Sequence, residues 1–391
     1  MAEITKPILL DESFNAKMDS LIEAVKYSGG AGKPKTFEDI QRMCRQGTIK
    51  QWLEVGEEFT FKYNGNDVPA VVMQFIENGR SGSLAIKNTN LKNGVVFQTK
   101  DLLMNLQFDE KEAFYYSPEG LPAGAYSFIL REHSWFSGDV GKTFYFTLAH
   151  ALPANGQIVF QQSYNATLEG ASIKTYAKGD ATVIDTATMS STAISGATAL
   201  GELKNSFSGN FNSCQRALLG NSRWSESAIR QMLNSNGNAG TYWQPQNHWD
   251  RRPSWYGSQA GFMKGLDTDL LPYVAEMSVD TYKNTVCDGG GLDTTIDKFF
   301  LAGNNEMYYP TEGADNGVVW ELYVKSSQYA SPNAGADPCR IKKLNGSATY
   351  WWLRSPHVGH ARDARLVLPS GERDNHDADT SYGLAPAFVI A

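Results

Sequence analysis

Hydrophobic and polar positions at the start of the chain alternate with a helical period. The apolar positions are spaced four, three and four residues apart, which is the a/d spacing of a coiled coil, and two acidic residues precede them. We expect an amphipathic helix over residues 11–27, followed by a glycine-rich linker. A helix this short is marginal alone, so it would mediate self-association or docking, or else pack on its own domain. Its apolar residues are Phe14, Met18, Leu21 and Val25.

Further along, the pattern predicts one more short helix and several strands. Thr36 stands before an amphipathic stretch with acidic residues in its first turn, so we expect a helix over residues 36–46 with Thr36 as its N-cap. Period-two alternation on either side of a turn predicts a β-hairpin of residues 59–63 and 68–73. Strands are also expected at residues 125–131, 143–148 and 157–162.

The second half of the chain has a mixed pattern. Residues 167–200 are rich in Ala, Thr, Ser and Gly with few large apolar side chains, which predicts an exposed extended segment. Helices are expected at residues 225–234 and 267–274, and short strands at residues 273–279 and 318–324.

Composition and charge narrow the class of protein. The 391 residues include 41% hydrophobic and 20% charged side chains, which is ordinary for a globular chain of two or three domains. A net charge of −7 argues against nucleic acid and anionic membranes as partners. No apolar run reaches the ~20 residues that span a bilayer, so no membrane insertion is expected. Many aromatic residues among abundant Gly, Ser, Thr and Asn indicate a loop-rich fold held by large rings.

The cysteines and the first residues bear on where the protein works. The four cysteines are far apart, with no Cys-x-x-Cys pair, and we interpret them as free thiols of a protein made in a reducing cytoplasm, with two disulfides as the alternative. The start lacks a basic stretch followed by an apolar one, so no secretory signal is expected. A surface-acting protein would then leave by another route, such as assembly into a virion released by lysis.

The C-terminal end of the chain combines an apolar frame with a polar centre. Residues 350–356 and 385–390 are apolar segments that predict core strands. Between them, residues 357–382 are polar, charged and small side chains without a helical or strand period. A polar loop on a rigid scaffold is where binding function is usually placed. The sequence therefore predicts a binding surface here.

These C-terminal residues resemble those of variable proteins diversified by retroelements. The shared features are a Trp-Leu-Arg-Ser segment at 352–355, a Ser-Gly turn at 370–371 and the terminal Ala-Pro-Ala-Phe-Val-Ile at 385–390. Proteins of this family have a C-type-lectin-like fold and are common among tail proteins of phages and prophages of gut bacteria. The resemblance covers about residues 38–391. Further segments match in the same order: residues 220–224, 227–235, 261–266 and 294–301.

The resemblance implies an α+β fold with three parts. Residues 1–35 would form the N-terminal helix and linker, for oligomerisation or docking, and residues 36–165 a β-rich N-terminal domain. Residues 166–391 would form a C-type-lectin-like ligand-binding domain with low regular secondary structure, its variable region at about 350–391. In such families a reverse transcriptase copies a template with errors at adenines, which scatters Asn-type codons into Asp, His, Tyr, Ser, Thr, Gly and Ala. These residue types dominate the polar run.

The resemblance also implies which side chains would bind a ligand and which would support them. The ligand-binding residues would lie together on one face, the candidate surface: His357, Val358, His360, Arg362, Asp363, Arg365, Leu368, Arg373, Asp374, Asn375, His376, Asp377 and Tyr382. The scaffold residues beneath it would be Trp351, Trp352, Leu353, Arg354, Pro386 and Phe388. Since neighbouring residues of a strand point to opposite faces, at most one of the two adjacent tryptophans could reach solvent, and we expect both to be core anchors.

Metal and catalytic sites are expected to be absent. His357 and His360 lie three residues apart with acidic residues following, but neither a zinc nor a calcium ligand pattern is present, so no metal is expected. No cofactor or catalytic residue is expected, because the chain has no nucleophile-elbow or zinc-protease motif. The enzyme alternative is a formylglycine-generating-type oxidase, which has a related fold and uses copper with closely placed cysteines. Cys287 and Cys339 would then have to meet in the fold.

The sequence and the resemblance together predict a receptor-binding or adhesion protein with a hypervariable surface. The expected role is host recognition by a phage tail, so the expected location is the virion, after synthesis in the bacterial cytoplasm. Its partner would be a protein or glycan receptor on the host cell surface, with a phage tail protein as a further partner. A homo-oligomer is expected, with a trimer preferred from the resemblance. The remaining alternative is a bacterial adhesin at the cell surface.

Overall fold

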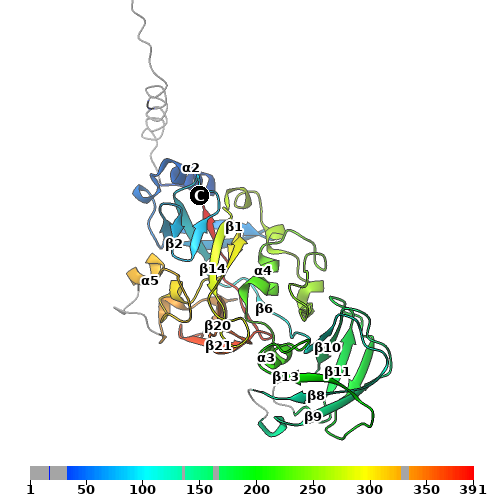
Figure 1. The fold of residues 1–391 in the computed structure, drawn as a ribbon. Helices are drawn as coiled ribbons and strands as arrows, with labels where there is room; N and C mark the ends of the chain where they lie inside the picture. Colours follow the sequence, from blue (N-terminus) through cyan, green and yellow to red (C-terminus); the bar gives the residue numbers. More distant parts are fainter. Residues whose placement is uncertain (1–16, 18–32, 134–136, 162–166, 327–333) are drawn as a thin grey trace, which may run out of the picture.

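The computed structural model describes Lys17 and residues 33–133, 137–161, 167–326 and 334–391 (Figure 1). Apart from Lys17, the helix predicted over residues 11–27 lies outside the described residues. The described part is an α+β structure, 35% strand and 15% helix, built from several small sheets of which none is closed. This confirms the predicted fold class at the level of α+β.

Three sheets share one hydrophobic core and form the body of the molecule. The first sheet has the strand order β1 (Glu58–Tyr63), β2 (Asn66–Ile76), β5 (Gly94–Thr99), β23 (Ala387–Ile390) and β16 (Phe299–Phe300). The second has the order β21 (Arg373–Asp377), β20 (Asp363–Val367), β19 (Trp351–Pro356), β22 (Ser381–Gly383) and β6 (Asn105–Gln107). The third has the order β15 (Leu292–Asp297), β14 (Met277–Tyr282), β4 (Leu84–Ile86) and β3 (Arg80–Ser81), and a small hairpin joins β17 (Lys343–Leu344) to β18 (Ser347–Ala348).

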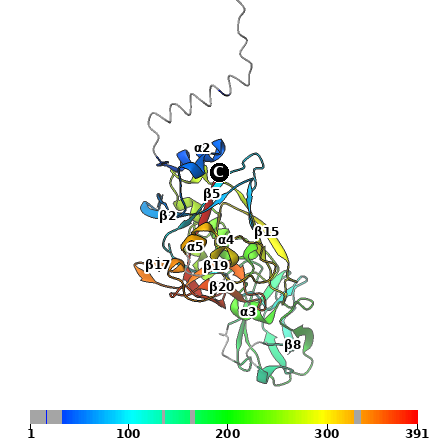
Figure 2. The same ribbon diagram turned by 90° about the vertical axis from the view of Figure 1, so that its left-hand side faces the viewer.

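Two further sheets enclose a separate core in the middle of the chain, the insertion region of residues 114–219. One sheet has the order β12 (Asp185–Thr188), β11 (Ser172–Tyr176), β10 (Gly156–Phe160) and β7 (Tyr115–Ser117). The other has the order β13 (Thr198–Leu203), β8 (Gly124–Leu130) and β9 (Thr143–Leu148). The insertion region lies below the body at the lower right of Figure 1 and again at the foot of the molecule in Figure 2.

The α-helices of the described residues are short: α2 (Phe37–Gln46), α3 (Cys214–Leu219), α4 (Ala228–Leu233) and α5 (Glu321–Ser326). The prediction of α2 is confirmed, because Asp39 N donates to Thr36 Oγ1 at 3.1 Å and Thr36 N donates to Asp39 Oδ2 at 3.2 Å, closing a capping box. Gly47 ends the helix in the left-handed conformation at φ +71°, which costs glycine little.

The hydrophobic cores group the chain differently from the predicted division at residue 165. The core of the body takes residues from both sides of the insertion region, from Phe37 to Phe108 and from Trp224 to Ala391. The two ends of the chain are joined because β23 pairs with β5 in the first sheet. Such long-range pairing leaves no mark on local composition, which is why a boundary near the middle of the insertion region was expected.

Several predicted strands are confirmed. The hairpin is formed by β1 and β2, which pair antiparallel around the turn at Asn64 and Gly65. The three strands expected between residues 125 and 162 are present as β8, β9 and β10. Their alternation of buried and half-exposed side chains is clearest in β9, where Phe144, Phe146 and Leu148 are buried.

The expectation of an exposed extended segment at residues 167–200 is wrong. The segment contains β11 and β12, and three of its large apolar side chains are buried in the insertion core. Leu168, Ile173 and Met189 are each 0% exposed. A strand needs only every second side chain to be apolar, so a small number of such residues suffices to cover one face of a sheet.

Three other predictions need correction. The helix expected at residues 267–274 is reduced to a 3-10 turn at Leu271–Tyr273, where Pro272 lacks the amide that would continue a helix. The strand expected at residues 318–324 is instead the start of α5, with Trp320 and Tyr323 buried at helical spacing. The strand expected at residues 273–279 begins later, as β14.

The helix expected at residues 225–234 is divided into two parts. A 3-10 turn covers Trp224–Glu226, and α4 begins after Ser227, whose hydroxyl accepts from Arg230 N at 3.3 Å. Ser227 is therefore the N-cap of α4, because its hydroxyl reaches the backbone of the following turn.

Membrane and cysteine expectations can also be compared with the structure. Within the described ranges, every helix is too short or too polar to cross a membrane. The four cysteines all lie within those ranges and are free, Cys44 and Cys214 being buried.

Candidate functional site

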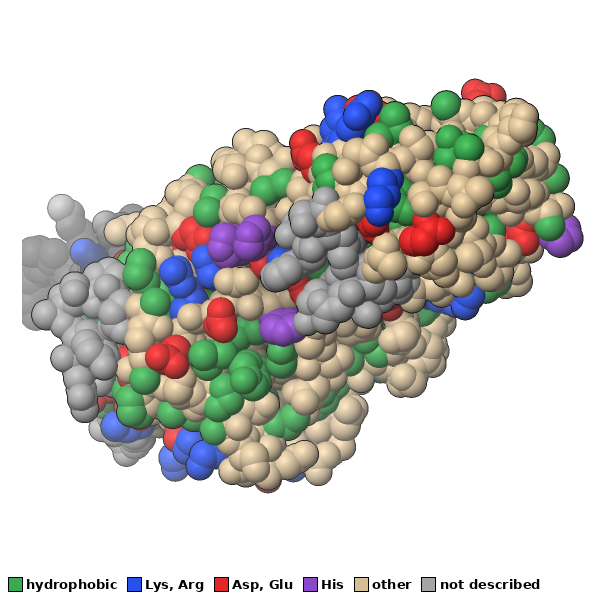
Figure 3. Space-filling model, turned by 90° about the horizontal axis from the view of Figure 1, so that it is seen from below, with side chains coloured by type: hydrophobic (Ala, Val, Ile, Leu, Met, Phe, Trp, Pro, Cys, Tyr) green, Lys and Arg blue, Asp and Glu red, His purple; other side chains and the backbone are tan. Residues whose placement is uncertain are grey.

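The candidate surface lies on the second sheet of the body and on the turn that leads into it. β19 runs through the core, residues 357–362 form a turn that we call the display loop, and β20 and β21 follow as an antiparallel pair. β21 is the edge strand of the sheet. Seen from below, this part of the molecule carries histidine, acidic and basic side chains side by side, next to a hydrophobic strip (Figure 3).

The predicted scaffold residues lie beneath this surface. Trp351 and Trp352 are both 0% exposed, and their indole Nε1 atoms donate to the backbone oxygens of Arg340 at 3.1 Å and Leu106 at 3.0 Å. The two rings therefore fill the core on both sides of β19 with their polar atoms satisfied. The other scaffold residues are buried as well: Leu353, Arg354, Pro386 and Phe388.

Arg354 forms a deeply buried ion pair beneath the site. Its guanidinium contacts both carboxylate oxygens of Glu306, at 2.6 and 2.7 Å, and the two side chains are only 2% and 1% exposed. The same guanidinium donates to Leu301 O at 2.8 Å and Ser83 Oγ at 2.9 Å. A buried charge pair with its hydrogen bonds satisfied fixes β19 relative to the loop that carries Glu306.

The backbone of the display loop is held by side chains and amides outside the loop. Glu312 Oε1 accepts from Val358 N at 3.0 Å, and Thr285 donates to Val358 O from both its N (2.9 Å) and its Oγ1 (3.0 Å). Gln215 Oε1 accepts from Ala361 N at 2.7 Å. Because none of these bonds uses a side chain of the loop, the loop keeps these anchors when its own side chains change.

Arg365 connects the strands of the site to Glu312. Its Nε donates to Glu312 Oε2 at 2.7 Å and its Nη2 donates to Glu312 Oε1 at 2.6 Å. This bidentate pair fixes the planes of the guanidinium and the carboxylate relative to each other. Burial raises the pKa of Glu312, but the hydrogen bonds from Arg365 and Val358 N outweigh it and hold that pKa below its ordinary value. Glu312 is therefore ionised at neutral pH and works as the fixed anchor of the site.

Two histidines of the display loop stack on each other. The rings of His357 and His360 lie 4.2 Å apart at an interplanar angle of 12°. His360 Nδ1 is 2.6 Å from Asp363 Oδ2, which fixes the orientation of that ring. Burial, helped by the charge of Arg365, lowers the pKa of His357 to about 4, so His357 is neutral at pH 7.

A carboxylate pair links β20 to β21. Asp363 and Asp377 lie directly opposite each other in the strand register, and Arg362 Nε donates to both, at 3.1 and 2.8 Å. Burial opposes it, but hydrogen bonding with His360 and the charge of Arg362 lower the pKa of Asp363 to about 2. Burial and the neighbouring carboxylate of Asp363 raise the pKa of Asp377 to about 7. The pair therefore carries one proton over much of the acidic range.

This pair predicts a pH dependence of stability. The folded protein keeps the proton of Asp377 to a higher pH than the unfolded chain, so the contribution of this group to the free energy of unfolding falls as pH rises from about 4 to about 7. His357 acts in the opposite direction in the same window, so the comparison must be with a variant. Asp377→Asn should gain stability relative to the wild type as pH rises.

Urea unfolding at pH 5 and pH 8 measures this difference. The control is Asp374→Asn, which changes an exposed carboxylate on the same strand. If the wild type and Asp377→Asn show equal changes in unfolding free energy between the two pH values, the shared proton does not exist.

The opposite face of β21 carries an aromatic cluster. Asp374 and His376 are exposed and point away from Arg365, since residues of a strand alternate between faces. The His376 ring meets the edge of Tyr382 at 5.3 Å, and Tyr382 lies 5.1 Å from Tyr350, which is 39% exposed. The cluster joins His376 and Tyr382 of the candidate surface to Tyr350, which lies beside that surface.

The structure places the thirteen residues of the candidate surface on one sheet and its turns, in the display loop, on β20, β21 and β22, and in the turn after β20, but not all of them are displayed. Three are buried and bonded to other charged groups: Arg362, Asp363 and Arg365. Two are exposed: Asp374 and His376. Eight are partly exposed: His357, Val358, His360, Leu368, Arg373, Asn375, Asp377 and Tyr382. The expectation that all thirteen side chains share one face is wrong. Successive side chains of β21, the edge strand, point to opposite faces of the sheet.

Some contributors to the site were not predicted from the sequence. Glu312, Thr285 and Gln215 come from three distant segments and reach the display loop only in the folded chain, and no motif marks them. Tyr350 could have been included, because it is the first residue of the apolar frame and its neighbour Trp351 points inward.

The histidines, acidic residues and cysteines can be compared with what a metal site or a reactive thiol requires. Among the residues that the structure describes, no group of three or more His, Cys, Asp or Glu side chains could hold a metal ion. Burial raises the pKa of Cys287 to about 12, whereas a reactive thiol needs a lowered pKa. Cys339 is exposed.

Comparison with known proteins gives one family. Residues 199–391 are similar to the family described as "Domain of unknown function (DUF6273)". The matched part begins within β13 and includes α3, the display loop and the whole candidate surface. Neither the curated proteins nor the solved structures contain a match to this chain.

Proposed function

We propose that this chain is a ligand-binding protein whose candidate surface is diversified by a retroelement and displayed on a C-type-lectin-like scaffold. In this proposal it recognises a protein or glycan receptor on a host cell as part of a phage tail, and no bond is made or broken. The proposal is supported by the resemblance of the C-terminal segments and by the residue types between residues 357 and 382.

One observation carries the proposal: the residues that support the sheet are buried, and most residues that would contact a ligand are different ones that reach solvent. Trp351, Trp352 and Phe388 are 0% exposed, while most residues between β19 and β23 that vary in such families keep part of their surface in solvent. The display loop makes its hydrogen bonds to Gln215 and Thr285 through its backbone and not through its side chains. A surface built in this way can change its chemistry at little cost in stability, since exposed substitutions usually change it by about 0.5 kcal/mol or less.

Affinity would come from a few contacts repeated over several copies. The aromatic cluster of Tyr350, Tyr382 and His376 offers the kind of side chains that dominate binding energies at interfaces. Linking several weak sites multiplies their effect through effective concentration. We therefore include self-association, preferably as a trimer through residues 11–27, in the proposal. Light scattering with and without residues 1–35 measures it.

The genes around the coding sequence test the diversification directly. A reverse-transcriptase gene beside a near-repeat of the 3′ end of this gene is expected, with the repeat differing mainly at adenines. A neighbourhood without either feature would remove the retroelement from the proposal. Structural tail genes nearby would favour the phage over the bacterial adhesin.

A further inference from the structure

The end of the insertion region touches the display loop through α3. Gln215, the second residue of this helix, accepts from Ala361 N at 2.7 Å. The next segment adds two bonds, because Ser222 donates to Ala361 O from its Oγ at 2.9 Å and from its N at 3.3 Å. Leu219 O accepts from Asp379 N at 3.0 Å, close to the end of β21. The insertion region therefore contacts the display loop and the residues that follow β21, at the end of the strand pair where Asp363 faces Asp377.

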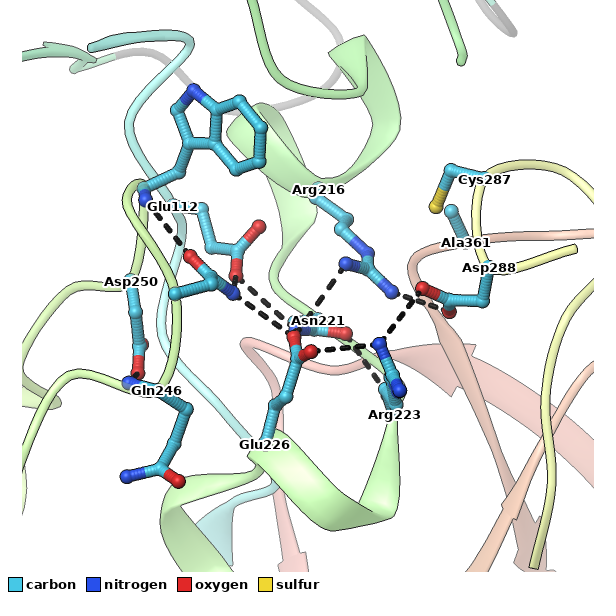
Figure 4. A network of polar contacts seen from close by, with 12 residues as sticks. Glu112, Arg216, Asn221, Arg223, Glu226, Gln246, Asp250, Cys287, Asp288 and Ala361 are labelled. Carbon is cyan, nitrogen blue, oxygen red and sulfur yellow. Dashed lines mark hydrogen bonds and ion pairs between the residues drawn. The ribbon is translucent and has the colours of Figure 1, made fainter. Parts of the chain in front are cut away.

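A buried charged network fixes α3 in place (Figure 4). Arg216 Nη2 contacts Asp288 Oδ2 at 2.5 Å, with each side chain 1% exposed, and its Nη1 lies 3.7 Å from Glu226. Glu226 is in turn paired with Arg223 at 2.8 Å. Figure 4 shows Arg216 between Glu226 and Asp288, with Ala361 beside Asp288. A buried guanidinium between two carboxylates has a strongly preferred position, because leaving it costs the pairing of a desolvated charge.

The same network holds the second anchor of the display loop. Asn284 Nδ2 donates to Asp288 Oδ2, and Asn284 Oδ1 accepts from Val286 N at 3.1 Å and Cys287 N at 3.0 Å, which closes the loop around Thr285. Thr285 then bonds Val358 O. Two chains of contacts thus lead from one buried charge pair to the display loop, one ending at Ala361 and the other at Val358.

We infer that Gln215 and Arg216 of α3 are positioning residues for the candidate surface, so that the insertion region sets the conformation in which the display loop meets its ligand. The inference rests on the proposed function in one respect, namely that the display loop binds a ligand. The physical linkage does not depend on it, since every contact involved lies within the free protein.

Hydrogen exchange of the full chain without ligand tests the first link. Gln215→Ala removes the acceptor of Ala361 N, and Gln215→Glu keeps an acceptor oxygen in the same place. A net hydrogen bond of about 1 kcal/mol corresponds to a change of roughly fivefold, so Gln215→Ala should speed exchange in residues 357–363 about that much. Peptides from β19 should be unchanged, and Gln215→Glu should resemble the wild type.

The inference is overturned if Gln215→Ala leaves exchange in residues 357–363 unchanged, or if β19 exchanges faster to the same degree. The first result would show that the contact is not used, and the second that the variant only weakens the fold.

Arg216→Lys tests the network behind Gln215. Lysine keeps the charge but cannot form the planar contact to both Asp288 and Glu226. Exchange should become faster at residues 284–288 and at residues 357–363 together. Faster exchange confined to α3 would mean that Arg216 supports only its own helix. Because no ligand is present in these experiments, their failure would leave the genetic test of the proposed function unaffected.

Discussion

Replacing Trp352 with alanine should destabilise the protein by about 3–5 kcal/mol, the usual cost of deleting a fully buried tryptophan side chain. The ring is 0% exposed, packs against Phe108 at 5.7 Å and Tyr382 at 5.0 Å, and donates from Nε1 to Leu106 O. The variant loses the packing of these neighbours and leaves a carbonyl without its partner. Urea unfolding followed by intrinsic fluorescence measures the change.

The matched control changes the surface above the same core. The double variant Asp374→Ala, His376→Ala removes two exposed side chains of β21 and should keep the melting temperature within a few degrees of the wild type. If the double variant lost as much stability as Trp352→Ala, the exposed residues of β21 would support the fold as the buried tryptophan does, which would contradict the account.

Removing Arg354 should have an effect of similar size by a different mechanism. Arg354→Met deletes the guanidinium that pairs with Glu306 and leaves a buried carboxylate without its counter-charge, which typically costs about 3–5 kcal/mol. Glu306 still accepts from Gly303 N at 2.7 Å and from Ser83 Oγ at 2.5 Å, so its ionised form remains partly solvated by the protein. Thermal and urea unfolding of the variant give the cost.

A double variant separates the charge from the packing. Glu306→Gln removes the uncompensated charge, and its single amide oxygen can still accept from Gly303 N while its amide nitrogen faces the Ser83 hydroxyl, which can accept. Arg354→Met with Glu306→Gln should therefore be more stable than Arg354→Met alone. Equal stabilities would show that the loss arises from packing and not from the buried charge.

Local patterns in the sequence predicted the elements whose causes are local. The capping pair Thr36 and Asp39 specifies α2, and the alternation around Asn64 and Gly65 specifies the hairpin of β1 and β2. Elements fixed by packing were missed or misplaced. Trp320 and Tyr323 were expected in a strand, but Trp320 directly precedes α5 and Tyr323 lies within it, and both rings are buried three residues apart.

The same division holds for the site. The apolar residues of the frame, such as Trp351 and Phe388, were expected in the core and are buried there. The partner that turns Arg365 into a buried support could not be predicted, because Glu312 is 53 residues from Arg365 in the chain. An arginine within a polar run looks exposed until the fold shows the carboxylate opposite it.

Sequencing this gene from many isolates tests the central claim most directly. The account predicts that substitutions gather at adenines within the codons of residues 357–382, above all at exposed positions such as Asp374 and His376, while the codons of Trp351, Trp352 and Phe388 stay unchanged. Substitutions spread evenly along the gene, or a region 357–382 that is invariant between isolates, would contradict it.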